Sequence, residues 1–146
     1  MKKLTHISAV TLLTLTFSLA QAAEKMIAGP KGGKLLEYEG QRAEFFVEKD
    51  RTVTVTFYDH ALTPVAPTEQ SVTVIAEAPG GKTTLAFEKK AELLVSKTPM
   101  PEGDGYNVVV QLKTTADAKP KNFRIAYKTH ACPTCKLAEY ACICDE

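Results

Sequence analysis

Hydrophobic and polar residues alternate along most of this chain, and the alternation is clearest at residues 52–59. There Val53, Val55 and Phe57 are separated by single threonines. A repeat of two is typical of a β-strand with one face in the core and the other in solvent, and no apolar stripe of useful length follows the helical repeat. Short segments of similar character recur at 33–39, 42–47, 71–77, 82–88, 93–96, 107–113 and 122–128. Their spacing predicts an all-β fold, an Ig-like or Greek-key β-sandwich of about seven to eight strands.

Turn-forming residues separate these predicted strands. Residues 48–51 (EKDR) and 78–81 (APGG) each predict a tight hairpin connection. Pro64 and Pro67 cannot donate a backbone hydrogen bond to a central ladder, so their loop is expected at a sheet edge or at a crossing between sheets. Residues 59 and 60 (Asp-His) end the clearest strand, and we expect the aspartate side chain to initiate the turn while His60 is solvated.

Tyr106 follows a loop rich in proline and glycine and immediately precedes an apolar strand. Greek-key sandwiches often place a tyrosine at such a corner, with the ring buried and the hydroxyl bonded to upstream backbone. The same pattern also fits a tyrosine on the surface after a loop, so the sequence leaves both interpretations open.

The N-terminus has the pattern of a secretory signal peptide over residues 1–22. Lys2 and Lys3 precede an apolar segment at 10–20, which ends in the small-x-small sequence Ala-Gln-Ala. That segment is too short for a permanent transmembrane helix. We therefore expect cleavage near Ala22, a periplasmic or secreted location, a sandwich domain over residues 23–129 and a cysteine-rich tail over 130–146.

Composition and motifs argue against nucleic-acid binding and against catalysis. The 18 Lys and Arg residues nearly balance the 17 Asp and Glu residues, so the chain lacks the basic excess that binds a phosphate backbone. Residues 80–84 (GGKTT) resemble the end of a phosphate-binding loop, but a strand pattern follows where that loop requires a helix. Ser71 and Ser96, the serines that follow the predicted signal peptide, have no histidine at a suggestive spacing. The sequence thus predicts a protein that is not an enzyme.

All four cysteines lie in the tail, where Cys132, Cys135, Cys142 and Cys144 form the pattern C-x2-C-x6-C-x-C. The first pair predicts a tight turn that brings two sulfurs together. If residues 140–144 are extended, the second pair shares one face of the strand. Four converging thiolates would suit Zn(II) or Cu(I), and His130 would supplement or replace one ligand.

In an oxidising compartment the cysteines would instead form disulfides between the first pair and the second. The protein would then be an exported structural or interaction module with a stapled tail and no metal. Residues 132–135 (CPTC) also have the spacing of a thiol-disulfide exchange motif, but the βαβ context of such enzymes is missing. Because the predicted strands end near Lys128, we expect the sandwich to fold without the tail.

Three short segments resemble the β-rich periplasmic segment of heavy-metal efflux adaptor proteins of the resistance-nodulation-division systems. They are residues 29–36 (GPKGGKLL), 43–47 (AEFFV) and 55–59 (VTFYD), and the last is followed by Pro64-Val65. The likeness spans residues 29–128 and implies a free-standing relative of one adaptor domain, with metal-efflux components as partners. Many of those adaptors have His-Gly-Gly where this chain has Lys31-Gly32-Gly33, so one potential metal ligand is missing here.

Overall fold

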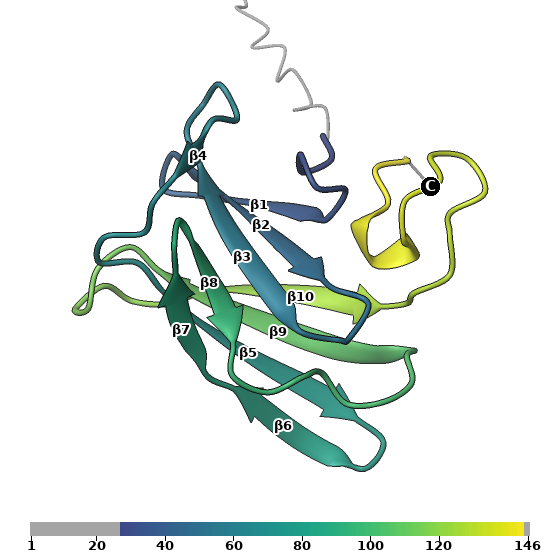
Figure 1. Cartoon of the computed structure of the whole chain (residues 1–146). Helices are drawn as coiled ribbons and strands as arrows, with labels where there is room; N and C mark the ends of the chain where they lie inside the picture. Colours follow the sequence, from purple (N-terminus) through teal and green to yellow (C-terminus); the bar gives the residue numbers. More distant parts are fainter. Residues whose placement is uncertain (1–26, 145–146) are drawn as a thin grey trace, which may run out of the picture.

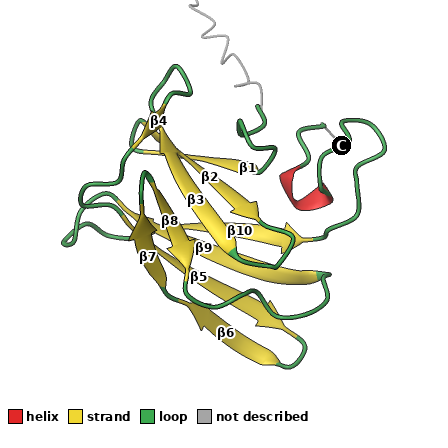
Figure 2. Cartoon of the chain, in the orientation of Figure 1, coloured by secondary structure: helices red, strands yellow, loops and turns green. Residues whose placement is uncertain are grey.

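The chain folds as a β-sandwich, as Figures 1 and 2 show in a computed structural model that describes residues 27–144. The predicted signal peptide lies outside the described residues. The strands are β1 (Lys34–Tyr38), β2 (Gln41–Val47), β3 (Val53–Tyr58), β4 (Pro64–Val65), β5 (Ser71–Ala78), β6 (Gly81–Leu85), β7 (Phe87–Lys90), β8 (Leu93–Ser96), β9 (Tyr106–Lys113) and β10 (Lys121–Tyr127). Within the described part, no helix is long and apolar enough to cross a membrane.

Two antiparallel sheets form the layers of the sandwich. The first has the order β1-β2-β3-β8-β7, with β4 also paired to β3, and the second has the order β10-β9-β5-β6. The core lies between them, where Phe45 and Val55 of the first sheet and Val74, Val108 and Val110 of the second are fully buried. Alternate residues of each strand supply this core, as the period of two requires. The predicted all-β sandwich is confirmed.

Residues 82–88, which the alternation predicts as one strand, form two strands in different sheets. β6 pairs with β5 in the second sheet, whereas β7 pairs with β8 in the first. The chain crosses between the layers at Ala86, so Leu85 enters the core from one sheet and Phe87 packs against it from the other. An unbroken alternation does not reveal this change of sheet, because both halves keep their inward side chains.

The second face of β3 is buried, although the sequence pattern predicts it in solvent. Thr54, Thr56 and Tyr58 are all less than 10% exposed, at 7%, 7% and 5%. β3 is a central strand, paired with β2 on one side and with β4 and β8 on the other. The Lys31 ammonium group also reaches this face and donates a hydrogen bond to Thr54 Oγ1 at 3.2 Å. The chain before β1 therefore covers a face that the threonines alone would leave polar and open.

The predicted turns agree with the structure. Between β2 and β3, the Arg51 N–H donates to Glu48 O at 2.9 Å and closes the hairpin. After β3, Asp59 Oδ1 accepts the N–H groups of Ala61 and Thr63 at 2.8 and 2.9 Å, while His60 is exposed. Asp59 thus has the turn role expected of it. The proline-containing loop supplies the short strand β4 beside β3 and then crosses to the second sheet.

Tyr106 forms the tyrosine corner that was one of its two interpretations. Its side chain is 5% exposed, and its hydroxyl donates a hydrogen bond to the Pro101 carbonyl at 3.0 Å. The ring packs against Tyr127 of β10, with centroids 5.2 Å apart. This corner stabilises the end of the sandwich from which the C-terminal tail departs.

Candidate metal centre

The tail leaves the sandwich directly after β10, and its first residues are anchored there. The Thr129 N–H and hydroxyl both donate to Asp104 Oδ2, at 2.9 and 2.8 Å. These hydrogen bonds lower the pKa of the Asp104 carboxyl below its usual value. Asp104 lies in the loop before β9, so the start of the tail is tied to a second, distant segment of the chain.

The first cysteine pair lies in a small closed loop. A β-bridge joins Ala131 to Ala138, and the Cys132 N–H donates to Leu137 O at 2.7 Å. The Lys136 N–H donates back to Cys132 O at 3.0 Å, and Lys136 has a left-handed backbone with φ of 64°. This geometry brings the first two cysteines into one tight turn, as their spacing predicts.

A short 3-10 helix, η1 (Glu139–Ala141), reverses the chain between the two cysteine pairs. The Cys142 N–H donates to Glu139 O at 3.1 Å at its end. Residues 140–144 are therefore not the extended segment considered from the sequence. The turn, rather than a strand face, returns Cys142 and Cys144 to the first pair, and Figure 2 shows it beside the end of the sandwich.

The four sulfur atoms lie within 4.8 Å of one another. Three of the separations are 3.2 Å for Cys142 to Cys132, 3.7 Å for Cys135 to Cys142 and 3.8 Å for Cys132 to Cys144. A tetrahedral site with zinc-to-sulfur bonds of ~2.3 Å has sulfur separations of about 3.8 Å. The cluster therefore has nearly the size that one tetrahedrally coordinated ion requires.

Backbone N–H groups favour the thiolate form of the first two cysteines. The N–H of Cys135, the Cys142 thiol and the N–H of Thr134 lower the pKa of the Cys132 thiol. The N–H groups of Ile143 and Leu137 lower the pKa of Cys135 to about 6. Donors aimed at sulfur spread the negative charge that a thiolate ligand carries, so the local backbone suits a bound cation.

The pKa values of the second pair are raised instead, for a different reason at each cysteine. A hydrogen bond with Cys132 raises the pKa of the Cys142 thiol, and partial burial raises the pKa of Cys144 to about 12. Four thiolates at this distance repel one another, and a cation at their centre relieves that repulsion. Cation binding is therefore expected to displace protons from this pair.

The structure leaves the predicted ligand His130 outside the sulfur cluster. Its side chain is exposed, and its Nε2 lies 3.9 Å from Glu139 Oε2. Among the cysteines, Cys132 is buried and the other three are half-buried. None of the four forms a disulfide within the described residues. The arrangement is thus an all-sulfur site near the surface.

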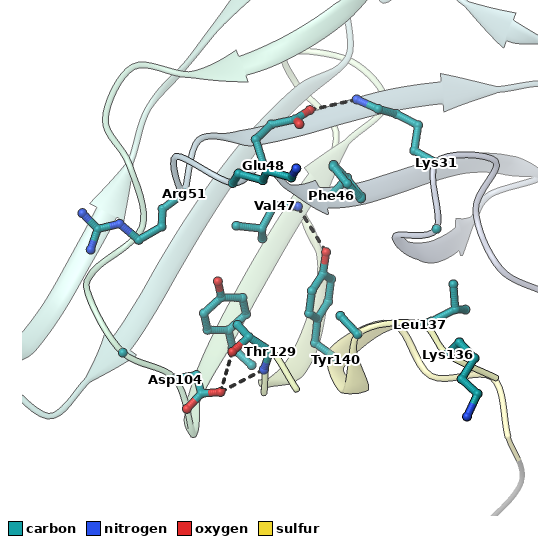
Figure 3. A pocket seen from close by; sticks show the side chains of 15 residues that line it. Lys31, Phe46, Val47, Glu48, Arg51, Asp104, Thr129, Lys136, Leu137 and Tyr140 are labelled. Atoms are coloured by element: carbon teal, nitrogen blue, oxygen red, sulfur yellow. Dashed lines mark hydrogen bonds and ion pairs between the residues drawn. The ribbon is translucent and has the colours of Figure 1, made fainter. Parts of the chain in front are cut away.

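A cleft of about 730 Å³ lies between residues 136–140 of the tail and the sandwich, and Figure 3 shows its lining. Lys31, Glu48 and Tyr127 line the sandwich side, and Lys136 and Tyr140 line the tail side. The Lys31 ammonium group pairs with Glu48 at 3.0 Å. The cleft is therefore a seam between two parts of the fold rather than a hollow within either one.

The glycine-rich segment at residues 29–33, which carries part of the adaptor resemblance, wraps a buried carboxylate. Glu44 is fully buried and accepts the N–H groups of Lys31 and Gly33 at 2.9 and 2.7 Å. The Tyr58 hydroxyl donates to it at 2.7 Å. Burial is the larger cause, and this hydrogen bond the second, of the raised pKa of Tyr58. A Cβ at Gly29 would collide with the carboxylate. The glycines therefore permit a close backbone approach, and this loop binds a side chain of the protein itself.

Sequence reasoning missed two residues that organise this end of the molecule, Glu44 and Tyr140. Glu44 lies in an alternating strand and gives no sign of burial until the glycine-rich loop is placed over it. Tyr140 carries a clearer signal, because it is the only aromatic residue of the tail and lies between the two cysteine pairs. Burial of an aromatic side chain removes a large apolar area from water, so a tyrosine at that position is expected to pack against the core.

The chain was also compared with known proteins. No family model, no curated protein and no solved structure matches it.

Proposed function

We propose that the protein binds a metal ion, Zn(II) or Cu(I), through Cys132, Cys135, Cys142 and Cys144. The observation that carries this proposal is the convergence of the four sulfurs to within 4.8 Å, at the size of a tetrahedral site. Sulfur ligands select soft or borderline ions over Mg(II) and Ca(II). The backbone donors around the first cysteine pair add support, because they stabilise thiolates without adding a competing ligand.

The proposal places the protein in the periplasm, as a binding protein without catalytic activity. The signal-peptide pattern of residues 1–22 supports export. The resemblance of residues 29–128 to a segment of metal-efflux adaptors supports a role beside metal-efflux components. In that role the sandwich serves as carrier and docking surface, and the tail holds the ion.

The competing function is an exported interaction module whose tail is closed by disulfides. Its support is the closeness of the sulfurs, since Cys142 and Cys132 are 3.2 Å apart. A disulfide requires ~2.05 Å, so only a small movement separates the two chemistries. An oxidising compartment favours that movement unless a metal occupies the thiolates first.

Native and denaturing mass spectrometry of protein purified from the periplasm without reductant tests the proposal. A metal-bound protein gains the mass of one ion in native spectra and loses it on acidification, because protons displace the metal from its thiolates. Two disulfides would instead remove about 4 Da under both conditions. Cys135→Ser should abolish metal retention, whereas His130→Ala should leave it unchanged. Full oxidation without metal uptake by the reduced protein would refute the proposal.

A further inference from the structure

Tyr140 joins the sulfur cluster to the core of the sandwich. The residue lies in η1, between Cys135 and Cys142, yet its side chain is only 6% exposed. Its ring packs edge-on against Phe45, with centroids 5.9 Å apart, and lies 5.6 Å from the ring of Tyr127. Edge-to-face and tilted pairs at these distances stabilise beyond the area they bury. The tail thus places one aromatic side chain inside the sandwich.

Hydrogen bonds hold Tyr140 at its side-chain hydroxyl and at its backbone N–H. The Val47 N–H donates to the Tyr140 hydroxyl at 3.2 Å, and the Tyr140 N–H donates to Lys128 O at 3.0 Å. The neighbouring Ala141 is fully buried. Figure 3 shows the tyrosine directed from the tail toward Val47. Val47 is the last residue of β2, so the Tyr140 hydroxyl accepts the final N–H group of a core strand.

The outer part of the tail has further contacts with the sandwich, and Ala138 packs against its core. The cleft lies between them, and Figure 3 shows the Lys136 side chain directed away from Tyr140. Leu137 lies close to the loop before β1, where a Cβ at Gly32 would be 3.3 Å from its Cδ2. Docking of residues 136–144 therefore involves Ala138, Tyr140 and Ala141, of which Tyr140 has the largest side chain.

We propose that metal binding at the four cysteines and docking of Tyr140 against the sandwich are thermodynamically linked, so that metal loading closes the tail and metal loss releases it. This inference rests on the proposed metal-binding function. It assigns the bound ion a regulatory effect on the surface around Phe45 and Tyr127, which the docked tail covers.

The linkage follows from where the tyrosine lies in the chain. Cys135 and Cys142 bracket it, and their sulfurs are 3.7 Å apart. Joining them through one ion closes the loop that carries Tyr140 and removes most of the conformational freedom that docking must otherwise overcome. Reciprocity then requires that whatever undocks Tyr140 also weakens metal binding by the same factor.

Amide hydrogen exchange with and without Zn(II) tests the inference on the whole mature protein, kept under reductant. We expect the Val47 amide to lose protection when a chelator removes Zn(II), by roughly 5- to 150-fold, a common range for coupled sites. The Val110 amide, in the core of the other sheet, reports global stability, so a loss of protection at Val47 that exceeds the loss at Val110 measures undocking of the tail. No variant is needed for this arm, so a failure to fold cannot obscure it.

The reciprocal arm measures Zn(II) affinity by competition with a chelating dye. Tyr140→Ala should weaken binding by a factor equal to the change in Val47 protection. Tyr140→Phe, which keeps the ring and loses only the hydroxyl contact, should weaken it less. If Zn(II) binds one to one but the Val47 amide does not respond, or Tyr140→Ala retains full affinity, the inference is wrong and the proposed function stands. If the reduced protein binds neither Zn(II) nor Cu(I), both are refuted.

Discussion

Two irregular segments meet at one end of the sandwich, and they are held there in different ways. The glycine-rich loop at residues 29–33 surrounds Glu44, a side chain that reaches outward from β2. The C-terminal tail sends Tyr140 inward, and its remaining contacts are mostly within itself. The loop is therefore anchored entirely by groups of the chain, whereas the tail has a cluster of four sulfurs that an ion can complete. A permanent anchor and a conditional one thus lie side by side.

The two segments also contact each other. Gly32, in the loop, lies against Leu137 of the tail, and both segments line the cleft shown in Figure 3. The loop therefore provides a constant surface against which the tail can dock. Substitutions in each segment should separate the two kinds of anchoring, because those in the loop act first on the stability of the sandwich and those in the tail act first on metal binding.

The largest effect is expected from Glu44→Leu, which removes the permanent anchor. Three donors, the N–H groups of Lys31 and Gly33 and the Tyr58 hydroxyl, lose their acceptor in a buried site. Each unpaired donor costs about 1–3 kcal/mol, so we expect the free energy of unfolding in urea to fall by about 3–5 kcal/mol. Zinc stoichiometry of the folded fraction should be unchanged.

The matched control for this substitution is Glu37→Gln, in the neighbouring strand β1. Glu37 is exposed and forms a surface ion pair with Arg42 at 2.6 Å. Its loss should change the free energy of unfolding by less than about 1 kcal/mol. If Glu44→Leu cost no more than this control, the buried carboxylate would not anchor the loop.

Tyr140→Ala should have the next largest effect, on the zinc-loaded protein. The substitution removes a ring that packs on Phe45 and Tyr127 and leaves a cavity beside the cleft. We expect the free energy of unfolding to fall by about 3 kcal/mol, near the lower end for buried aromatic residues. Tyr140→Phe should cost about 1 kcal/mol, the value of one hydrogen bond. Equal stability of all three proteins would show that the tail is only a surface appendage.

This stabilising role of Tyr140 was not expected from the sequence. The predicted strands end near Lys128, which suggested a sandwich that folds without its tail. Strand alternation detects residues that enter the core from a sheet, such as Val53, Val55 and Phe57. Tyr140 enters the core from a three-residue helix in a segment whose cysteines dominate its composition. No local pattern reports that long-range contact, whose partner on β2 is 93 residues away along the chain.

The cysteine cluster was the most predictable part of the candidate site, for a local reason. Cys132 and Cys135 meet within one turn, so their spacing alone brings their sulfurs together. The return of the second pair to the first depends on η1, which the sequence did not indicate. The extended segment predicted for residues 140–144 brought Cys142 and Cys144 near each other but did not bring them to the first pair. His130 is exposed beside Glu139 and is not part of the group of four sulfurs, a placement that its position next to the first cysteine pair did not indicate.

Gly33→Ala should have a smaller effect than either anchor substitution. A Cβ at position 33 would lie 2.5 Å from the Phe45 carbonyl oxygen, so the loop must move away from β2. Such overpacking costs about 2 kcal/mol, and thermal or urea unfolding should show the loss. Gly80→Ala is the control, because position 80 is open and its backbone suits an L-residue. If the two variants had equal stability, the close approach of the loop to β2 would not be required.

Lys136→Gly is expected to produce the smallest effect, and it should strengthen the conditional anchor. Lys136 has φ of 64° within the turn that follows the first cysteine pair, a left-handed conformation that costs an L-residue about 1–2 kcal/mol. Glycine removes that cost but gives up roughly 0.5–1 kcal/mol of chain entropy. The net gain of about 0.5 kcal/mol corresponds to a roughly twofold increase in zinc affinity, measurable by dye competition. Lys136→Ala keeps the Cβ and loses the same ammonium contact to Pro133 O, so it should show no gain. Weaker binding by Lys136→Gly than by Lys136→Ala would mean that the turn does not keep this backbone when the cysteines hold the ion.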